Sequence, residues 1–218
     1  MPMEKGSDMK KMDNNRYEII EKYAAELAAM EGYDRESWKI MVKFGETCYE
    51  TVDGADFASL STDDIRETGD EDSAHPIERQ ILQGGSEINA LVLSRTPYCL
   101  QAAKQGRPLT AALDDMAQIV GYQVQTVCYE KGAIDTALGK ATGCFVRDRG
   151  VTITCGRNLY EAVVALTVLE KSAEVNLKAE AIGGAKPLPK IEADLMRMIY
   201  KKKYSVAEQE VKSKEGDA

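Results

Sequence analysis

The amino-acid sequence predicts an α/β fold in which a central, mostly antiparallel or mixed β-sheet is covered by helices on both faces, giving three layers. Short apolar segments typical of strands are interspersed with amphipathic helices along the chain. Two pairs of strands are separated by tight turns, which favours hairpins over a purely parallel sheet. The composition, with 44% hydrophobic and 29% charged residues, is typical of a chain that buries a core.

The chain begins with a polar segment, then a helix and a hairpin. Residues 1–14 are polar and are predicted to be a disordered N-terminus. A helix is predicted over 15–31 because apolar residues recur at steps of three or four, and a glycine follows. Strands are predicted at 38–42 and 47–52, and the short connection between them suggests a hairpin.

Capping signals mark the next elements. Ser61 and Asp64 have the spacing of a capping box and predict a helix start. Residues 67–73 are rich in acidic side chains and are predicted to form an exposed loop. Pro76 then opens a helix predicted over 77–82, where the missing N–H of proline does no harm.

The middle of the chain alternates between the two element types. The apolar segment 88–93 predicts a buried strand, and a Thr-Pro pair opens a helix predicted over 97–103. A second helix is introduced by residues 108–110 and is predicted to reach Val120, where a glycine stops it. The alternating segment 122–129 predicts a strand, and a short helix is predicted over 134–140.

The C-terminal part contains the second hairpin and the longest helix. Strands are predicted at 144–147 and 151–155. Asn158 caps a long apolar-striped helix, and Glu161 completes a capping-box pattern. A final helix is predicted from about Glu192.

No domain linker or repeat interrupts this pattern. The organisation expected is therefore a disordered segment 1–14, a single domain over 15–200 and a polar C-terminal tail over 201–218.

The net charge limits the classes of partner. Lys and Arg number 28 and Asp and Glu number 36, giving a formal net charge of −8. Such a chain repels phosphate backbones and anionic membranes, so neither nucleic acid nor a membrane is an expected partner. No apolar run is long enough to cross a bilayer, and the polar first residues show no secretory signal. A cytoplasmic location is expected.

Cysteine and histidine argue against several kinds of site. The chain has five cysteines and no CxxC pair, so a disulfide framework and a cysteine zinc site are disfavoured, and the cysteines are expected to be buried. His75 is the single histidine, so one chain cannot assemble a metal site from several imidazoles. It is expected to be a surface or helix-capping residue. Phosphate-binding loops, dinucleotide fingerprints and nucleophile elbows are also missing, and no cofactor is implied.

Two arginines next to predicted strands are candidate anion ligands. Arg95 directly follows the strand 88–93, and Asp148 and Arg149 occupy the tip of the second hairpin. One interpretation is a turn with two solvated charges. The other is a guanidinium pair that binds an anion, because arginine matches carboxylate and phosphate geometry.

Several segments, in order and spacing, resemble the class II aldolase/adducin family, which includes fuculose-phosphate aldolase and ribulose-phosphate 4-epimerase. The similarity extends over about residues 17–197 and implies the fold of that family. It is carried by LSTDDI at 60–65, ALVLSRTPY at 90–98, MAQIVG at 116–121, GCFVRDRG at 143–150, VTITCG at 151–156 and the long helix that follows.

The resemblance breaks at the metal site. In the family, two histidines of a His-x-His step and a third in an Asn-His-Gly turn bind a divalent metal, usually zinc. The matching positions here are Leu93, Arg95 and Arg149. Leucine has no lone pair, and arginine stays protonated and cannot ligate a cation. The resemblance therefore implies the fold without a metal, and no residue is assigned as a metal ligand.

Other family positions are only partly kept. The acid/base glutamate of the family aligns near Ala74, with Glu71 and Glu78 as alternatives under a gap. In the phosphate-holding turns only Gly54 is clearly retained, and Asp53 beside it would repel a phosphate.

The leading hypothesis is a metal-free binding or assembly module, as in the adducin head. Arg95 and Arg149, with Gly54 and Ser94, would line a cleft for a small anion such as a carboxylate or sugar acid. Because enzymes of the family form fourfold assemblies, the resemblance implies a homo-oligomer, most simply a homotetramer.

Two alternatives remain open. The first is a metal-independent aldehyde-lyase or epimerase-like enzyme acting on a phosphosugar or sugar acid. In it, the two arginines replace the metal as electrophiles, and Asp148, Glu78 or Tyr98 handles protons. The second is a structural subunit that partners an active paralogue.

Overall fold

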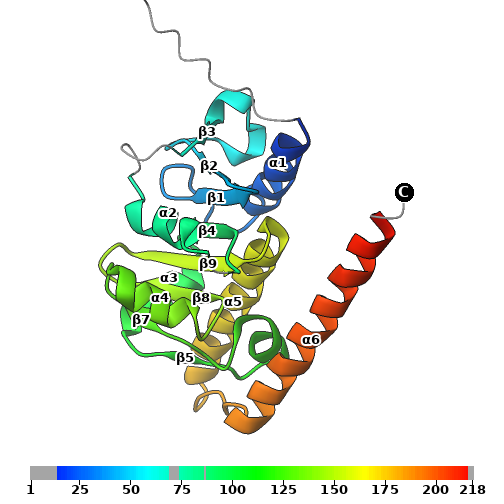
Figure 1. The fold of residues 1–218 in the computed structure, drawn as a ribbon. Coiled ribbons are helices and arrows are strands. Elements are labelled where there is room, and N and C mark those ends of the chain that lie inside the picture. Colours follow the sequence, from blue (N-terminus) through cyan, green and yellow to red (C-terminus); the bar gives the residue numbers. More distant parts are fainter. Residues whose placement is uncertain (1–13, 69–73, 86, 216–218) are drawn as a thin grey trace, which may run out of the picture.

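A computed structural model describes residues 14–68, 74–85 and 87–215. Its centre is a seven-stranded sheet with the order β3-β2-β1-β4-β9-β8-β7 (Figure 1). Neighbouring strands are antiparallel except β7 and β8, which are parallel, so the predicted mixed sheet is confirmed. The strands of this sheet are β1 (Lys39–Phe44), β2 (Thr47–Thr51), β3 (Ile65–Glu67), β4 (Ala90–Ser94), β7 (Thr126–Val127), β8 (Gly143–Val146) and β9 (Val151–Gly156).

Helices cover both faces of the sheet, which confirms the three-layer prediction. One face packs against α1 and α5 through a cluster that includes Ile20, Trp38 and Leu166. The other face packs against α2 and α4 through Leu82 and Ile134, among others. The helices are α1 (Asn14–Ala28), α2 (Pro76–Gln83), α3 (Pro97–Gln105), α4 (Lys131–Leu138), α5 (Leu159–Glu180) and α6 (Lys190–Glu215).

Both predicted hairpins are present. β1 pairs with β2 from Met41↔Glu50 to Phe44↔Thr47, and β8 pairs with β9 from Gly143↔Thr154 to Val146↔Val151. The connections contain Gly45 at φ +62° and Gly150 at φ +60°. A side chain at such a left-handed φ is strained, which explains a glycine in each turn.

Two predicted caps are formed. Ser61 and Asp64 make a reciprocal capping box on a short 3₁₀ helix, Thr62–Asp64, which follows another at Phe57–Ser59. The side chain of Asn158 accepts a hydrogen bond from the Glu161 N–H at the start of α5.

The segment between α3 and α4 departs from the sequence prediction. Residues 108–110 do not introduce a helix, because β5 (Leu109–Thr110) pairs with β6 (Gln123–Val124) in a small separate sheet. The helical part before Gly121 contains a π-helical segment, η3 (Met116–Val120). The predicted strand 122–129 is split between β6 and β7, which belong to different sheets. The sequence does not predict strand β3, because three residues carry no readable alternation.

The last helix is longer than the sequence suggests. α6 reaches Glu215, whereas the sequence predicts a polar tail from residue 201. Its first turns pack on η3, and its later turns extend away from the sheet (Figure 1). The acidic segment 67–73 lies mostly outside the described residues, and its first residue, Glu67, ends β3.

The cysteines follow the prediction with one exception. Cys48, Cys99, Cys144 and Cys155 are buried, whereas Cys128 is exposed, and all five are free thiols. Burial raises the pKa of the Cys155 thiol to about 12, which keeps it protonated and unreactive at neutral pH. A search of the described residues finds no helix with the length and apolar character of a membrane span.

Gly156 provides a test of how β9 meets α5. A Cβ at this position would lie 2.5 Å from Glu161 Cβ, 2.7 Å from Ala162 N and 2.8 Å from Asn158 O. We expect Gly156→Ala to lower the free energy of unfolding by about 1–3 kcal/mol or more, because the first turn of α5 must move. Chemical denaturation followed by circular dichroism measures the change.

Gly132→Ala is the matched control. Gly132 lies in α4, and a Cβ there meets no atom within 4 Å. Alanine should leave stability unchanged or raise it by up to about 1 kcal/mol through helix propensity. Equal stability of the two variants would show that β9 and α5 are not packed as described.

Candidate functional site

The pairing of β4 with β9 brings the two candidate arginines together. Ser94 pairs with Thr152, so Arg95, just past the end of β4, lies beside the β8–β9 turn that carries Arg149. The Nη2 atom of Arg95 donates a hydrogen bond to the carbonyl oxygen of Arg149 at 3.0 Å. Both arginines are exposed, so their remaining donors can reach a ligand in solvent.

Tyr129 and Asp148 position the turn. The guanidinium carbon of Arg149 lies 4.0 Å from the centroid of the Tyr129 ring, a cation–π contact. The two carboxylate oxygens of Asp148 accept the Tyr129 backbone N–H at 2.9 and 3.1 Å. Asp148 therefore fastens the hairpin tip to the residues after β7, and its carboxylate is used in this contact. The tip is a turn at the surface, as one interpretation of the sequence has it, but its arginine is held in place.

Glu78 lies behind Tyr129. It is on α2, its exposed fraction is 0%, and its Oε2 accepts a hydrogen bond from the Tyr129 hydroxyl at 2.8 Å. Its Oε1 has no hydrogen-bond partner among the described residues. Burial, and then the bond to this carboxylate, raise the pKa of Tyr129 well above its ordinary value. The tyrosine is therefore protonated, and it connects a buried carboxylate to a surface guanidinium.

Two further buried charges lie on the same face of the sheet. Lys39, only 3% exposed, pairs with Asp53 at 2.5 Å, and this bond lowers the pKa of the Asp53 carboxyl. Glu50, 1% exposed, accepts a hydrogen bond from Arg66 Nε at 2.7 Å. The sequence suggests that Asp53 would repel a phosphate. In the structure Lys39 neutralises the charge of Asp53, which weakens that repulsion.

Sequence reasoning did not single out Lys39, Glu50 or Tyr129. A signal was available for the first two. Lys39 lies two positions from Met41 on β1, and Glu50 lies two positions from Cys48 on β2, so each charged residue shares a strand face with a buried apolar one. No comparable signal marks Tyr129, whose partner Glu78 is 51 positions away.

The other predicted residues are placed differently. Leu93 is part of the apolar cluster under α2 and α4. Ser94 is fully buried, and its hydroxyl has no hydrogen-bond partner among the described residues, so it does not share the exposed rim with the arginines. Gly54 lies in the turn after Asp53 at φ +77°. Ala74 is exposed, and Glu71 lies outside the described residues.

Tyr98, a candidate for handling protons, belongs to another part of the molecule. Its backbone N–H donates to Glu170 of α5, and Lys178 lies 5.5 Å from the centroid of its ring.

The donors present do not fit the metal that the family resemblance implies. Over the ranges described above, no three His, Cys, Asp or Glu side chains lie close enough together to hold an ion. The positions that the resemblance matches to the family's metal ligands hold a core leucine, which has no lone pair, and two arginines, whose permanent positive charge repels a cation.

Comparisons with known proteins agree with the fold. The sequence model of the family described as "Class II Aldolase and Adducin N-terminal domain" matches residues 35–177. A solved structure named L-fuculose 1-phosphate aldolase superposes with a TM-score of 0.76 at 19% identity, covering 90% of this chain and 100% of that one. The L-fuculose-1-phosphate aldolase of Thermus thermophilus gives a TM-score of 0.69 at 18% identity, covering 81% of this chain and 100% of that one.

A third neighbour has a similar name. The L-fuculose 1-phosphate aldolase of Glaciozyma antarctica gives a TM-score of 0.67 at 20% identity, covering 84% of this chain and 82% of that one. No curated protein sequence gives a significant match. At these identities, the structural likenesses establish the fold.

His75 reports on the charged groups beneath α2. It is half-buried at the N-cap of α2, and burial is the main cause that lowers its pKa, with Lys39 acting in the same direction against Glu78, Asp53 and Glu50. Because it is the single histidine, its imidazole gives one isolated NMR signal. We expect this signal to titrate below the ordinary value of about 6.5.

The same shift fixes the sign of the pH effect on stability. Below about pH 6.5 the unfolded chain takes up a proton that the folded chain resists, so the free energy of unfolding falls as the pH drops. His75→Gln should reduce this slope between pH 7 and 5. A titration midpoint above 6.5 would contradict the burial of His75.

Proposed function

The chain belongs to the class II aldolase and adducin family, and we propose that it is a metal-free member in which two guanidinium groups take the place of the family's metal and bind a small anion. Arg95 and Arg149 are the ligands, and the anion is a carboxylate or sugar acid. The protein acts as a binding or assembly module.

The observation that carries this proposal is that both guanidinium groups are held in place without a carboxylate partner among the described residues. Neither guanidinium lies within ion-pair distance of a carboxylate in the part of the chain that the structure describes. Arg149 is oriented by Tyr129, and Arg95 is fixed to the backbone of Arg149. Two oriented cations with free donors favour a planar anion, which can accept hydrogen bonds from both.

Glu78 favours the alternative of a metal-independent enzyme. Its Oε1 has no hydrogen-bond partner among the described residues and its Oε2 accepts from Tyr129, so the tyrosine can relay a proton between this carboxylate and the rim. In a lyase or epimerase of a sugar acid or phosphosugar, the arginines would stabilise the negative charge that develops on the substrate oxygens. Among the acid/base candidates, Glu78 fits this role best.

We also propose a homo-oligomer, most simply a tetramer, in which α6 contacts a second copy. Four large apolar side chains on α6 are exposed by 50–86% and lie on one side of the helix, namely Ile191, Leu195, Met198 and Ile199. Glu192 lies near one end of this stripe, and Lys202 lies near the other. An antiparallel helix of a second copy would cover the apolar stripe and pair acidic with basic ends.

Arg149→Met tests the anion site. We expect D-glucuronate to bind the protein, measured by isothermal calorimetry, and the variant to bind at least tenfold more weakly, because a charged hydrogen-bond donor is lost while the side-chain stem remains. Arg107→Met is the control, since Arg107 is already paired with Glu180 on another surface. Equal affinity of the Arg149 variant and the wild type would refute the site.

Metal analysis and an activity assay separate the two functions. One equivalent of zinc per chain, lost on chelation, would contradict both. Retro-aldol cleavage of fuculose 1-phosphate that survives EDTA and disappears in Glu78→Gln would select the enzyme over the module.

The mass in solution tests the oligomer. Light scattering after gel filtration should give a multiple of 24.0 kDa for the wild type, four chains in the simplest case. The double variant Leu195→Ser, Ile199→Ser should shift to smaller species, because the apolar stripe is broken. Ile182→Ser removes an isoleucine outside α6 that is more exposed than either of these residues, at 87%, and should not change the mass. A monomeric wild type would end this part of the proposal.

A further inference from the structure

A second site lies at the opposite end of the β4–β9 pair. There, Ala90 pairs with Gly156, and the chain beyond Gly156 turns into α5. A cavity of about 820 Å³ opens at this point, between the ends of α2 and β9, the first turns of α5, and the helices α4 and α6. This volume is within the range of about 300–1,000 Å³ that small-molecule sites occupy.

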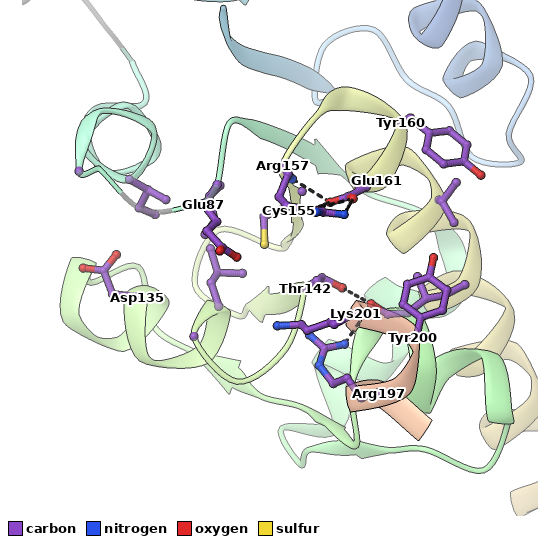
Figure 2. A pocket seen from close by; sticks show the side chains of 18 of the residues that line it. Glu87, Asp135, Thr142, Cys155, Arg157, Tyr160, Glu161, Arg197, Tyr200 and Lys201 are labelled. Atoms are coloured by element: carbon purple, nitrogen blue, oxygen red, sulfur yellow. Dashed lines mark hydrogen bonds and ion pairs between the residues drawn. The ribbon is translucent and has the colours of Figure 1, made fainter. Parts of the chain in front are cut away.

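The cavity has an apolar wall and a cationic wall. The apolar wall includes Ile81, Ile88, Ile119, Leu138 and Val164. The cationic wall is one side of α6, from which Arg197 and Lys201 extend toward β9 (Figure 2). Spaced four residues apart, these two side chains lie on the same side of the helix.

The charges of the lining leave a positive excess. Five basic residues and three acidic residues contribute to it. Arg157 pairs with Glu161 and Lys131 pairs with Asp135, so two of the acidic groups are already neutralised. The chain as a whole has a net charge of −8, so this local excess runs against the overall composition.

Arg197 is a partly buried cation whose charge is not balanced by an ion pair with any described residue. It is half-buried, and burial lowers the pKa of its guanidinium. Its Nη1 donates to the carbonyl oxygen of Ile119 at 3.1 Å, and no carboxylate of the described residues forms an ion pair with it. A partly desolvated charge without a counter-charge costs free energy, which an anion in the cavity would offset.

We propose that this cavity binds an amphipathic organic anion. Its carboxylate, sulfonate or phosphate group is held by Arg197 and Lys201, and its apolar body lies against Ile119, Leu138 and Val164. The site is separate from the Arg95–Arg149 rim and does not depend on it.

A pair of dyes with the same apolar body tests the proposal. 8-Anilino-1-naphthalenesulfonate carries the anion, and N-phenyl-1-naphthylamine lacks it. Fluorescence titration of the full chain should give saturable binding of one sulfonate dye per chain. Lys201→Met and Arg197→Met should each weaken the sulfonate dye at least tenfold and change the neutral dye less than threefold.

Two controls locate the binding. Lys203→Met removes a charge from the same helix outside the cavity and should leave both affinities unchanged. Val164→Trp fills the cavity and should abolish the binding of both dyes. Because Arg197 also bonds to the backbone of Ile119, Lys201→Met tests the charge even where the arginine variant fails to fold.

Two results would overturn the proposal. The first is an affinity for the sulfonate dye that Lys201→Met does not change. The second is binding that persists in Val164→Trp, which would place the dye elsewhere, for example on the apolar stripe of α6.

Discussion

The antiparallel ladder between β4 and β9 is the constraint on which the rest of the structure depends. Five residue pairs join Ala90–Ser94 to residues 152–156, and every residue of β4 is buried. A slip of one residue would turn Leu91 and Leu93 away from α2 and α4 and into the layer where Ala90 and Val92 now pack, so the packing of both layers specifies the register. One end of the ladder brings Arg95 to Arg149, and the other places Gly156 under the first turn of α5. Both proposed sites are therefore consequences of one strand pairing.

Three ionisable residues, Lys39, Glu50 and Glu78, are almost fully buried on or beneath α2, and the strand pairing does not explain why. Lys39 and Glu50 each have an oppositely charged partner, which lowers the cost of their burial. Glu78 is different, because its Oε2 accepts a hydrogen bond from an uncharged tyrosine and its Oε1 has no hydrogen-bond partner among the described residues. Apolar residues at this position would pack at no electrostatic cost, so stability alone does not account for the glutamate. Its Oε2 bonds the tyrosine on which Arg149 is stacked, and this contact connects Glu78 to the proposed anion rim.

The elements that could be predicted from the sequence are those with strong local signals. The hairpins were specified by glycine turns, and α5 by the Asn158 cap and its apolar stripe. The two-residue strand β5 could not be predicted, because only its pairing with β6 defines it. Arg95 and Arg149 were singled out by their places at a strand end and a hairpin tip, and the family resemblance then matched both to one site. Their support by Tyr129 and Glu78 could not be predicted, since these contacts join segments that share no local pattern.

In the proposed function, arginines stand in place of metal-binding histidines, and this changes the sign of the charge that the rim would accept. Imidazoles donate lone pairs to a cation, whereas guanidinium groups donate protons to an anion. A chain of net charge −8 repels such anions at long range, yet at physiological salt this repulsion is screened beyond about 8 Å. Contacts at hydrogen-bond distance are screened far less. At the proposed anion site, discrimination between anions would come from the fixed directions of the donors. Stacking on Tyr129 orients Arg149, and the bond to the Arg149 carbonyl oxygen orients Arg95.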